Sequence, residues 1–148
     1  MTHRHGILAL LILFGTTGCD GTKRTDVTGV WRMTDESRSR LPPHVRRTHA
    51  TLTVRENGLF EAHDIPGELV SEPDTTVDAS GEWRLTDKDR TMRVDVLTMT
   101  GGKRNIVPFT TEIDVVGRSH KVVLRYFIGD PDSWNTVEFE KRQSQDVR

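Results

Sequence analysis

Runs of alternating apolar and polar residues make up most of this chain, and they constrain its fold more than any other feature. In Thr48–Glu56, for example, Ala50, Leu52 and Val54 share one face, against polar residues on the other. A repeat of two places successive side chains on opposite faces of a β-strand, whereas a helix needs a repeat near 3.6. No segment predicts a helix longer than a turn or two. The chain is therefore expected to form strands that bury one face.

Turn signals divide these runs into about eight strands. Asn57-Gly58 is a strong signal for a tight hairpin, because both residues accept positive φ. The expected strands lie within residues 28–35, 48–56, 59–65, 80–87, 91–99, 106–116, 121–128 and 137–139. Burying one face of such a set favours a sheet that curls into a barrel or folds into a sandwich. The predicted fold class is all-β: a single small antiparallel up-and-down barrel or a strongly curled sheet.

The composition narrows the class of protein. The 148 residues fit one domain, and 34% of them are hydrophobic. The formal net charge is −1, which argues against nucleic acid as the main partner, because nucleic-acid-binding proteins usually carry a basic excess. A single cysteine excludes an intrachain disulfide and a cysteine-rich metal site.

The first 18 residues have the pattern of a secretory signal. Arg4 precedes the apolar run Ile7–Phe14, and the small residues Gly15–Gly18 follow it. The run is far shorter than the roughly 20 residues that cross a bilayer as a helix. The predicted organisation is a signal peptide (1–18), a flexible tether (19–27), a barrel-like domain (28–142) and a disordered tail (143–148).

Thr16-Thr17-Gly18-Cys19 resembles the lipobox of bacterial lipoproteins, although an aliphatic residue is usual at the position of Thr16. The resemblance implies that the thiol of Cys19 carries a diacylglyceryl group and that cleavage makes this residue the first of the mature chain. The implied location is the bacterial cell envelope, anchored to a lipid bilayer and facing the periplasm or the exterior, with the choice of inner or outer membrane left open. The alternatives are a plain secreted protein with an incidental cysteine and a cytosolic protein with an apolar start.

Two eight-residue segments echo each other, TGVWRMTD at 28–35 and SGEWRLTD at 80–87. Both place a tryptophan, Trp31 or Trp83, two residues after a glycine. These tryptophans are interpreted as caps of a small core, with a ligand platform as the alternative. The echo indicates either pseudo-symmetric halves or two independent uses of one way to begin a strand.

Gly29-Val30-Trp31 resembles the G-x-W opening of lipocalins and other calycins, which are small ligand-binding barrels. The further T-D-Y turn of that family is missing. In the family an arginine packs on the tryptophan, and Arg125 and Arg142 are the candidates here. The chain is also similar to small bacterial lipoproteins of unknown function, through the G-x-W motif, Asn57-Gly58-Leu59-Phe60 and Gly129-Asp130-Pro131-Asp132.

Polar candidates for a site each have a simpler structural interpretation. Asp130 and Asp132 are a candidate cation pair, but a proline-fixed β-turn is favoured. His49 and His63, completed by Asp64 or Glu61, are a candidate metal site if they face each other across the hairpin; exposed strand residues are favoured. Trp134 either closes the barrel end or is an exposed contact residue.

One loop is rich in basic residues, and these are Arg38, Arg40, His44, Arg46, Arg47 and His49. It is a candidate contact with anionic lipid headgroups beside the anchor, or with an acidic partner; a solvated loop is the default.

No cofactor, metal or catalytic signature appears in the sequence. The first functional hypothesis is a non-enzymatic binding barrel that takes an envelope protein or a small apolar ligand. The alternatives are an envelope hydrolase with catalytic residues dispersed in the sequence and a passive structural or inhibitor-like lipoprotein. A filled interior would favour protein contact, and the inward positions that decide this are Leu52, Val54, Trp83, Leu85, Val94 and Val96.

Overall fold

The computed structural model describes residues 23–43, 45–67, 75–86, 90–102, 108–118, 121–128 and 135–142. Several predicted features lie outside these ranges, namely the signal peptide, Cys19, His44, the Asp130–Asp132 turn, Trp134 and the tail.

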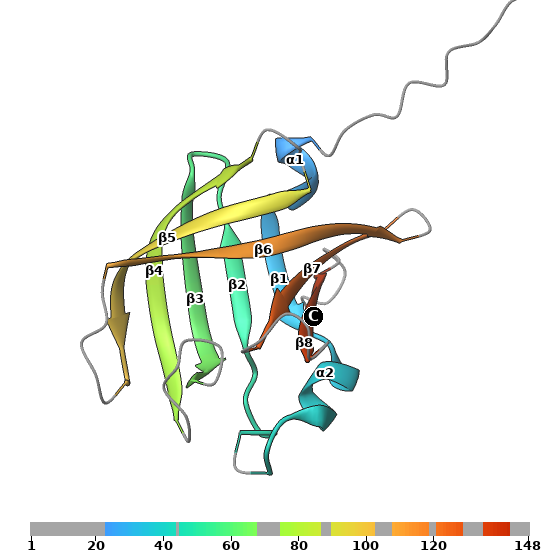
Figure 1. Cartoon of the computed structure of the whole chain (residues 1–148), viewed down its shortest axis with the longest axis vertical. Coiled ribbons are helices and arrows are strands. Elements are labelled where there is room, and N and C mark those ends of the chain that lie inside the picture. Colours follow the sequence, from blue (N-terminus) through green and yellow to red (C-terminus); the bar gives the residue numbers. More distant parts are fainter. Residues whose placement is uncertain are drawn as a thin grey trace, which may run out of the picture.

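Eight strands close into one antiparallel barrel, in which each strand pairs with the next and the last pairs with the first (Figure 1). The strands are β1 (Gly29–Met33), β2 (Thr51–Val54), β3 (Leu59–Pro66), β4 (Thr76–Leu85), β5 (Thr91–Thr100), β6 (Phe109–Arg118), β7 (Lys121–Phe127) and β8 (Thr136–Lys141). The predicted all-β up-and-down fold is confirmed, and of the expected alternatives the closed barrel is the one that forms. Closure leaves no unpaired edge along the ring, which removes a route to aggregation.

The first hairpin shows how the sequence sets the register. Its loop has three residues, 56–58, because the amide of Arg55 donates to Leu59 O at 2.9 Å and Gly58 adopts a φ of 88°. Leu52 consequently lies opposite Ala62, and Val54 opposite Phe60. A two-residue loop would shift the pairing by one residue and put apolar side chains opposite polar ones.

Two short helices flank the first strand. α1 (Arg24–Val27) lies within the segment predicted to be a flexible tether, yet Val27 is fully buried. The folded body thus begins before residue 28. α2 (Asp35–Arg40) lies at the start of the predicted basic loop, and Leu41 and Val45 beyond the helix are buried in the core. Neither helix is long or apolar enough to span a bilayer, and the described residues contain no other candidate.

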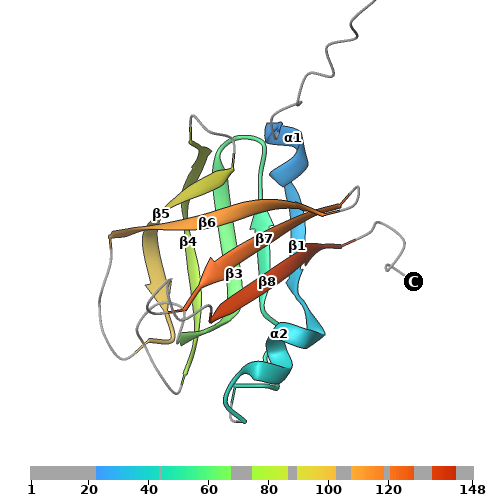
Figure 2. The same cartoon turned by 45° about the vertical axis from the view of Figure 1, so that its right-hand side comes forward.

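The helices mark the two ends of the barrel, with α1 at one end and α2 at the other in both views (Figures 1 and 2). We call these the α1 end and the α2 end. The β2–β3 hairpin and the start of β5 lie at the α1 end, whereas β4 begins and β5 ends at the α2 end.

The echoed segments occupy β1 and β4, which run in opposite directions because three antiparallel pairings separate them. A three-strand repeat does not divide a ring of eight. The structure therefore favours two independent uses of the motif over pseudo-symmetric halves. Both tryptophans nevertheless point inward, at exposed fractions of 0% for Trp31 and 4% for Trp83.

Candidate binding site at one end of the barrel

Tryptophans and α1 seal the α1 end. The indole Nε1 of Trp31 donates to Val27 O in α1, and that of Trp83 donates to Arg55 O in the β2–β3 hairpin, each at 2.8 Å. A buried indole N–H needs such a partner, because an unsatisfied donor is costly. The bonds therefore fix α1 and the hairpin over the end of the core.

A cation lies over each indole ring. Arg24 Cζ is 4.8 Å from the centroid of Trp83, and Lys141 Nζ is 5.7 Å from that of Trp31. Lys141 therefore lies over the Trp31 ring, where Arg125 or Arg142 was predicted. Arg125 instead pairs with Glu138 at 3.0 Å, and the backbone amide of Arg142 donates to Val30 O at 2.8 Å.

Side chains fill the half of the interior next to this end. Met92 and Leu124 are fully buried. Most of the positions chosen to decide whether the barrel is filled are also buried: Leu52, Val54, Trp83, Val94 and Val96. Leu85 is half-buried. A cavity wide enough for water would leave its lining side chains exposed, so this half is packed.

In the half of the interior next to the α2 end, one side of the ring is less completely buried. Six inward-facing side chains of β4–β7 and the residue after β7 remain partly exposed at the α2 end, namely Ala79, Met99, Phe109, Thr111, Tyr126 and Ile128. We call these the accessible cluster. Met99 lies opposite Ala79, and the hydroxyl of Thr111 donates to Tyr126 Oη at 3.3 Å. An apolar surface with one polar pair is the composition of many small-molecule sites.

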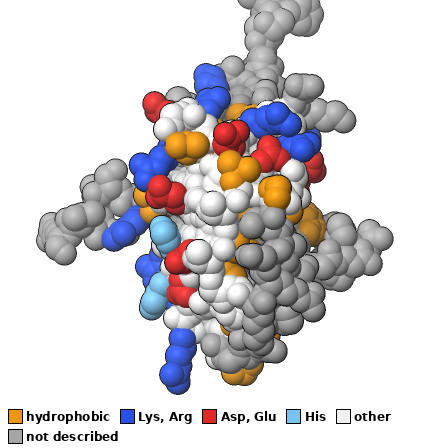
Figure 3. Space-filling model, turned by 90° about the vertical axis from the view of Figure 1, so that its left-hand side faces the viewer, with side chains coloured by type: hydrophobic (Ala, Val, Ile, Leu, Met, Phe, Trp, Pro, Cys, Tyr) orange, Lys and Arg blue, Asp and Glu red, His pale blue; other side chains and the backbone are white. Residues whose placement is uncertain are grey.

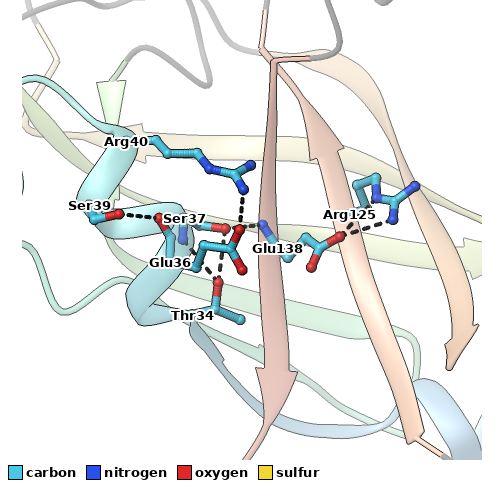
Figure 4. A network of polar contacts seen from close by, with 7 residues as sticks. All are labelled: Thr34, Glu36, Ser37, Ser39, Arg40, Arg125 and Glu138. Carbon is cyan, nitrogen blue, oxygen red and sulfur yellow. Dashed lines mark hydrogen bonds and ion pairs between the residues drawn. The ribbon is translucent and has the colours of Figure 1, made fainter. Parts of the chain in front are cut away.

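The segment between β1 and β2 covers the opposite side of the ring at this end. Its residues Leu41, Val45 and Ala50 are buried against the core. The segment is attached where the β1–β8 ladder stops, because Thr34 N donates to Glu138 O at 2.9 Å and Glu138 N donates to the buried Ser37 hydroxyl at 2.8 Å (Figure 4). The hydroxyl of Thr34 caps α2 by accepting from Ser37 N. Among the described residues, no such segment lies over the accessible cluster, whose side chains remain partly exposed.

The predicted basic loop belongs to this covering segment, at the α2 end. Arg38 pairs with Asp35 and Arg40 with Glu36, while Arg46 Nε donates to Leu41 O at 2.7 Å. Arg46 and Arg47 are both exposed. The predicted anchor, Cys19, lies outside the described residues; the first described residue, Lys23, lies at the α1 end, whereas this loop lies at the α2 end.

The candidate histidine site does not form. Thr51, not His49, lies opposite His63, which is 3.7 Å from Asp78. Asp64 is occupied by the backbone amide of His49, whose N–Oδ2 distance is 2.6 Å. Figure 3 shows the histidine side chains at the outer surface, beside acidic ones. Within the described ranges, no three His, Cys, Asp or Glu residues are grouped to hold a metal ion.

A polar network also lies on the outer face of β5 and β6. The hydroxyl of Thr110 donates to Asp95 Oδ1 at 2.6 Å, and Arg93 Nε is 3.4 Å from the same oxygen. The hydrogen bond from Thr110, assisted by Arg93, holds the pKa of Asp95 below its ordinary value. Because the network faces away from the interior, we assign it a structural role.

No protein-family model, curated protein or solved structure matches this chain. The assignment of the accessible cluster as a binding site therefore depends on the structure alone. Alternation in the sequence assigns most of its members to an inward face, but it does not reveal which inward side chains the loops leave uncovered.

Proposed function

We propose that this protein is a non-enzymatic, lipid-anchored barrel of the bacterial envelope that binds a small apolar ligand at its α2 end. The anchor is the acylated thiol of Cys19, and the ligand contacts are the accessible cluster. The resemblance of Gly29-Val30-Trp31 to the opening of lipocalins supports a ligand-binding barrel of this kind.

The observation that carries the proposal is the position of Met99, Phe109 and Ile128. These residues are apolar and face inward, yet they remain partly exposed, whereas most inward residues of the α1 half are buried, Leu85 and Val122 being partly exposed. Covering such surface with an apolar ligand removes it from water, which is favourable at about 25 cal/mol per Å².

The packed α1 half limits the depth of the site and therefore the size of the ligand. The pair formed by Thr111 and Tyr126 offers hydroxyl groups to a single polar substituent. The ligand class that fits is a short amphipathic molecule with one polar end, such as a medium-chain fatty acid.

A flat protein-binding surface has less support. The exposed large apolar residues Val30, Leu59 and Leu97 lie on three different strands, β1, β3 and β5. Single surface apolar residues are normal and do not define a patch. The hydrolase hypothesis gains no support from the described histidines, because both lie on the outer surface. His63 lies 3.7 Å from Asp78, and the backbone amide of His49 donates to Asp64.

Titration with 1-anilinonaphthalene-8-sulfonate, competed with dodecanoate, tests the ligand site. Phe109→Glu places a charge in the accessible cluster and should weaken probe binding at least tenfold. Leu97→Glu is the matched control, because it puts the same charge on the outer face of the neighbouring strand. Equal binding by both variants and the unchanged protein would contradict the proposal.

The anchor is tested separately in cells. Cys19→Ser should move the protein from the membrane fraction to the soluble fraction or leave it unprocessed, and labelled palmitate should no longer be incorporated. Unchanged fractionation would exclude the acyl anchor without affecting the ligand site.

A further inference from the structure

We infer that the α1 end of the barrel docks on an anionic bilayer surface and thereby turns the accessible cluster away from the membrane. This inference rests on the lipid anchor of the proposed function and adds an interaction surface to it.

The first observation is where the chain enters the fold. Lys23, the first described residue, precedes α1, and α1 is fixed to the barrel through Val27. Only four residue steps separate Lys23 from Cys19. An extended chain spans at most about 3.6 Å per residue, so an acylated Cys19 holds the α1 end within about 14 Å of the bilayer.

The second observation is the charge of that end. Seven exposed cations occupy α1, the strand ends and the hairpin there: Lys23, Arg24, Arg55, Arg90, Lys121, Lys141 and Arg142. The described acidic residues in the same positions are Asp26, Glu56, Glu61, which pairs with Arg55 at 2.9 Å, and Glu140, so the end carries about +3 (seven minus four). We call the seven basic residues the α1-end cations.

This charge is localised. The other described residues balance, with nine of them basic and nine acidic. A bilayer that contains acidic lipids therefore attracts the α1 end more than the rest. Each cation close to an anionic surface adds about fivefold to the affinity, and the effect decays within a Debye length of about 8 Å at physiological salt.

The α1-end cations fit a flat anionic surface better than a single anionic ligand. They are distributed over α1, the β2–β3 hairpin, the starts of β5 and β7, and the end of β8, where Lys141 Nζ donates to Asp26 O in α1 at 3.3 Å. With this end against the headgroups, the α2 end faces the aqueous compartment, where a ligand can reach the accessible cluster.

The acylated full-length protein, reconstituted in nanodiscs that contain a paramagnetic headgroup lipid, provides the test. We expect the amide signal of Gly58 at the α1 end to broaden more in nanodiscs with about 30% phosphatidylglycerol than in pure phosphatidylcholine. Each cation near the anionic headgroups adds about fivefold to the affinity, which holds this end closer to the paramagnetic lipid. The signal of Gly101 at the α2 end should change little. Raising the salt to about 0.5 M should remove the difference.

Two double variants of the same chemistry make the test specific. Arg90→Gln with Lys121→Gln should clearly reduce the lipid dependence at Gly58, because two of the seven α1-end cations are lost. Arg46→Gln with Arg47→Gln removes the same charge at the α2 end and should leave it intact. Equal broadening of Gly58 and Gly101 in bound protein, or equal effects of the two variants, would overturn the docking surface alone. Failure of the unmodified protein to stay on the nanodiscs would overturn the anchor as well.

Discussion

The guanidinium of Arg24 lies over the ring of Trp83, with 4.8 Å between Cζ and the ring centroid. The same indole donates to Arg55 O, and the backbone amide of Trp83 donates to Gly58 O at 2.7 Å. A residue of β4 thus connects α1 and the first hairpin. This connection explains why a four-residue helix, too short to be stable alone, has a fixed place on the barrel.

Arg24→Gln should lower the free energy of unfolding by about 0.5–1 kcal/mol, since it removes an exposed cation–π contact and little else. Urea titration followed by tryptophan fluorescence measures the change. Arg47→Gln is the control, because it removes an exposed arginine from the other end; a loss of equal size there would contradict the role of the ring contact.

Ser37→Ala should cost about 1–3 kcal/mol, because the amide of Glu138 loses its partner in a region shielded by α2. Ser39→Ala in the same helix should change stability by less than about 0.5 kcal/mol, since Ser39 is exposed and bonds only to Glu36 O in its own helix. Thermal unfolding of both variants tests this difference. Similar melting temperatures would show that the Ser37 hydroxyl does not hold the segment to β8.

Gly81→Ala should destabilise the barrel by about 3 kcal/mol or prevent folding. An added Cβ would overlap the carbonyl oxygen of Asp95 and lie 2.9 Å from Phe60 Cε1. Gly117→Ala, also in a strand, meets nothing within 4 Å and should be neutral or slightly stabilising. Chemical denaturation of the pair measures the effect, and equal stability would mean that β4 and β5 do not approach as closely as described.

Lowering the pH should reduce the contribution of Asp95 to the stability of the fold. Because its pKa in the folded protein is lowered, the carboxylate stabilises the fold above its unfolded pKa, near 3.9, and this stabilisation is lost as the pH falls through the folded value. Thr110→Val should raise the pKa of Asp95, since the hydroxyl that bonds the carboxylate is the largest cause of the shift. Carboxyl-carbon NMR titration measures the pKa directly; an unchanged value would show that the hydrogen bond does not form.

Local alternation was enough to predict the strands and their buried faces. Leu52 with Val54, and Phe60 with Ala62, lie inward because the apolar positions of each strand recur every second residue. Closure into a ring follows less directly, because a curled sheet satisfies the same pattern. The pairing of β1 with β8 joins residues more than 100 positions apart, and no local signal encodes it.

The candidate site depends on an irregularity that alternation does not contain. β5 has one extra residue at Leu97, because Gly81 pairs with Val96 while Ser80 pairs with Thr98. The bulge reverses the alternation, so Met99 faces inward although its position suggests the opposite face. Gly81, which permits the close approach of β5, is the one sequence signal that could have indicated it.

The prediction of a flexible tether over residues 19–27 had a similar limit. Whether residues 24–27 fold depends on Arg24 reaching Trp83 and on Trp31 bonding Val27, and the first of these contacts spans three strands of the ring. The sequence of this segment alone is short, polar and compatible with a flexible linker.

Methionine-methyl NMR tests the central claim most directly, because β5 carries one methionine in each half of the barrel. Met92 is fully buried near the α1 end, and Met99 belongs to the accessible cluster. On titration with dodecanoate, the Met99 methyl signal should shift with saturation while that of Met92 stays in place. Saturable shifts of Met92 alone, or the absence of any shift at Met99, would contradict a filled barrel that binds its ligand at the α2 end.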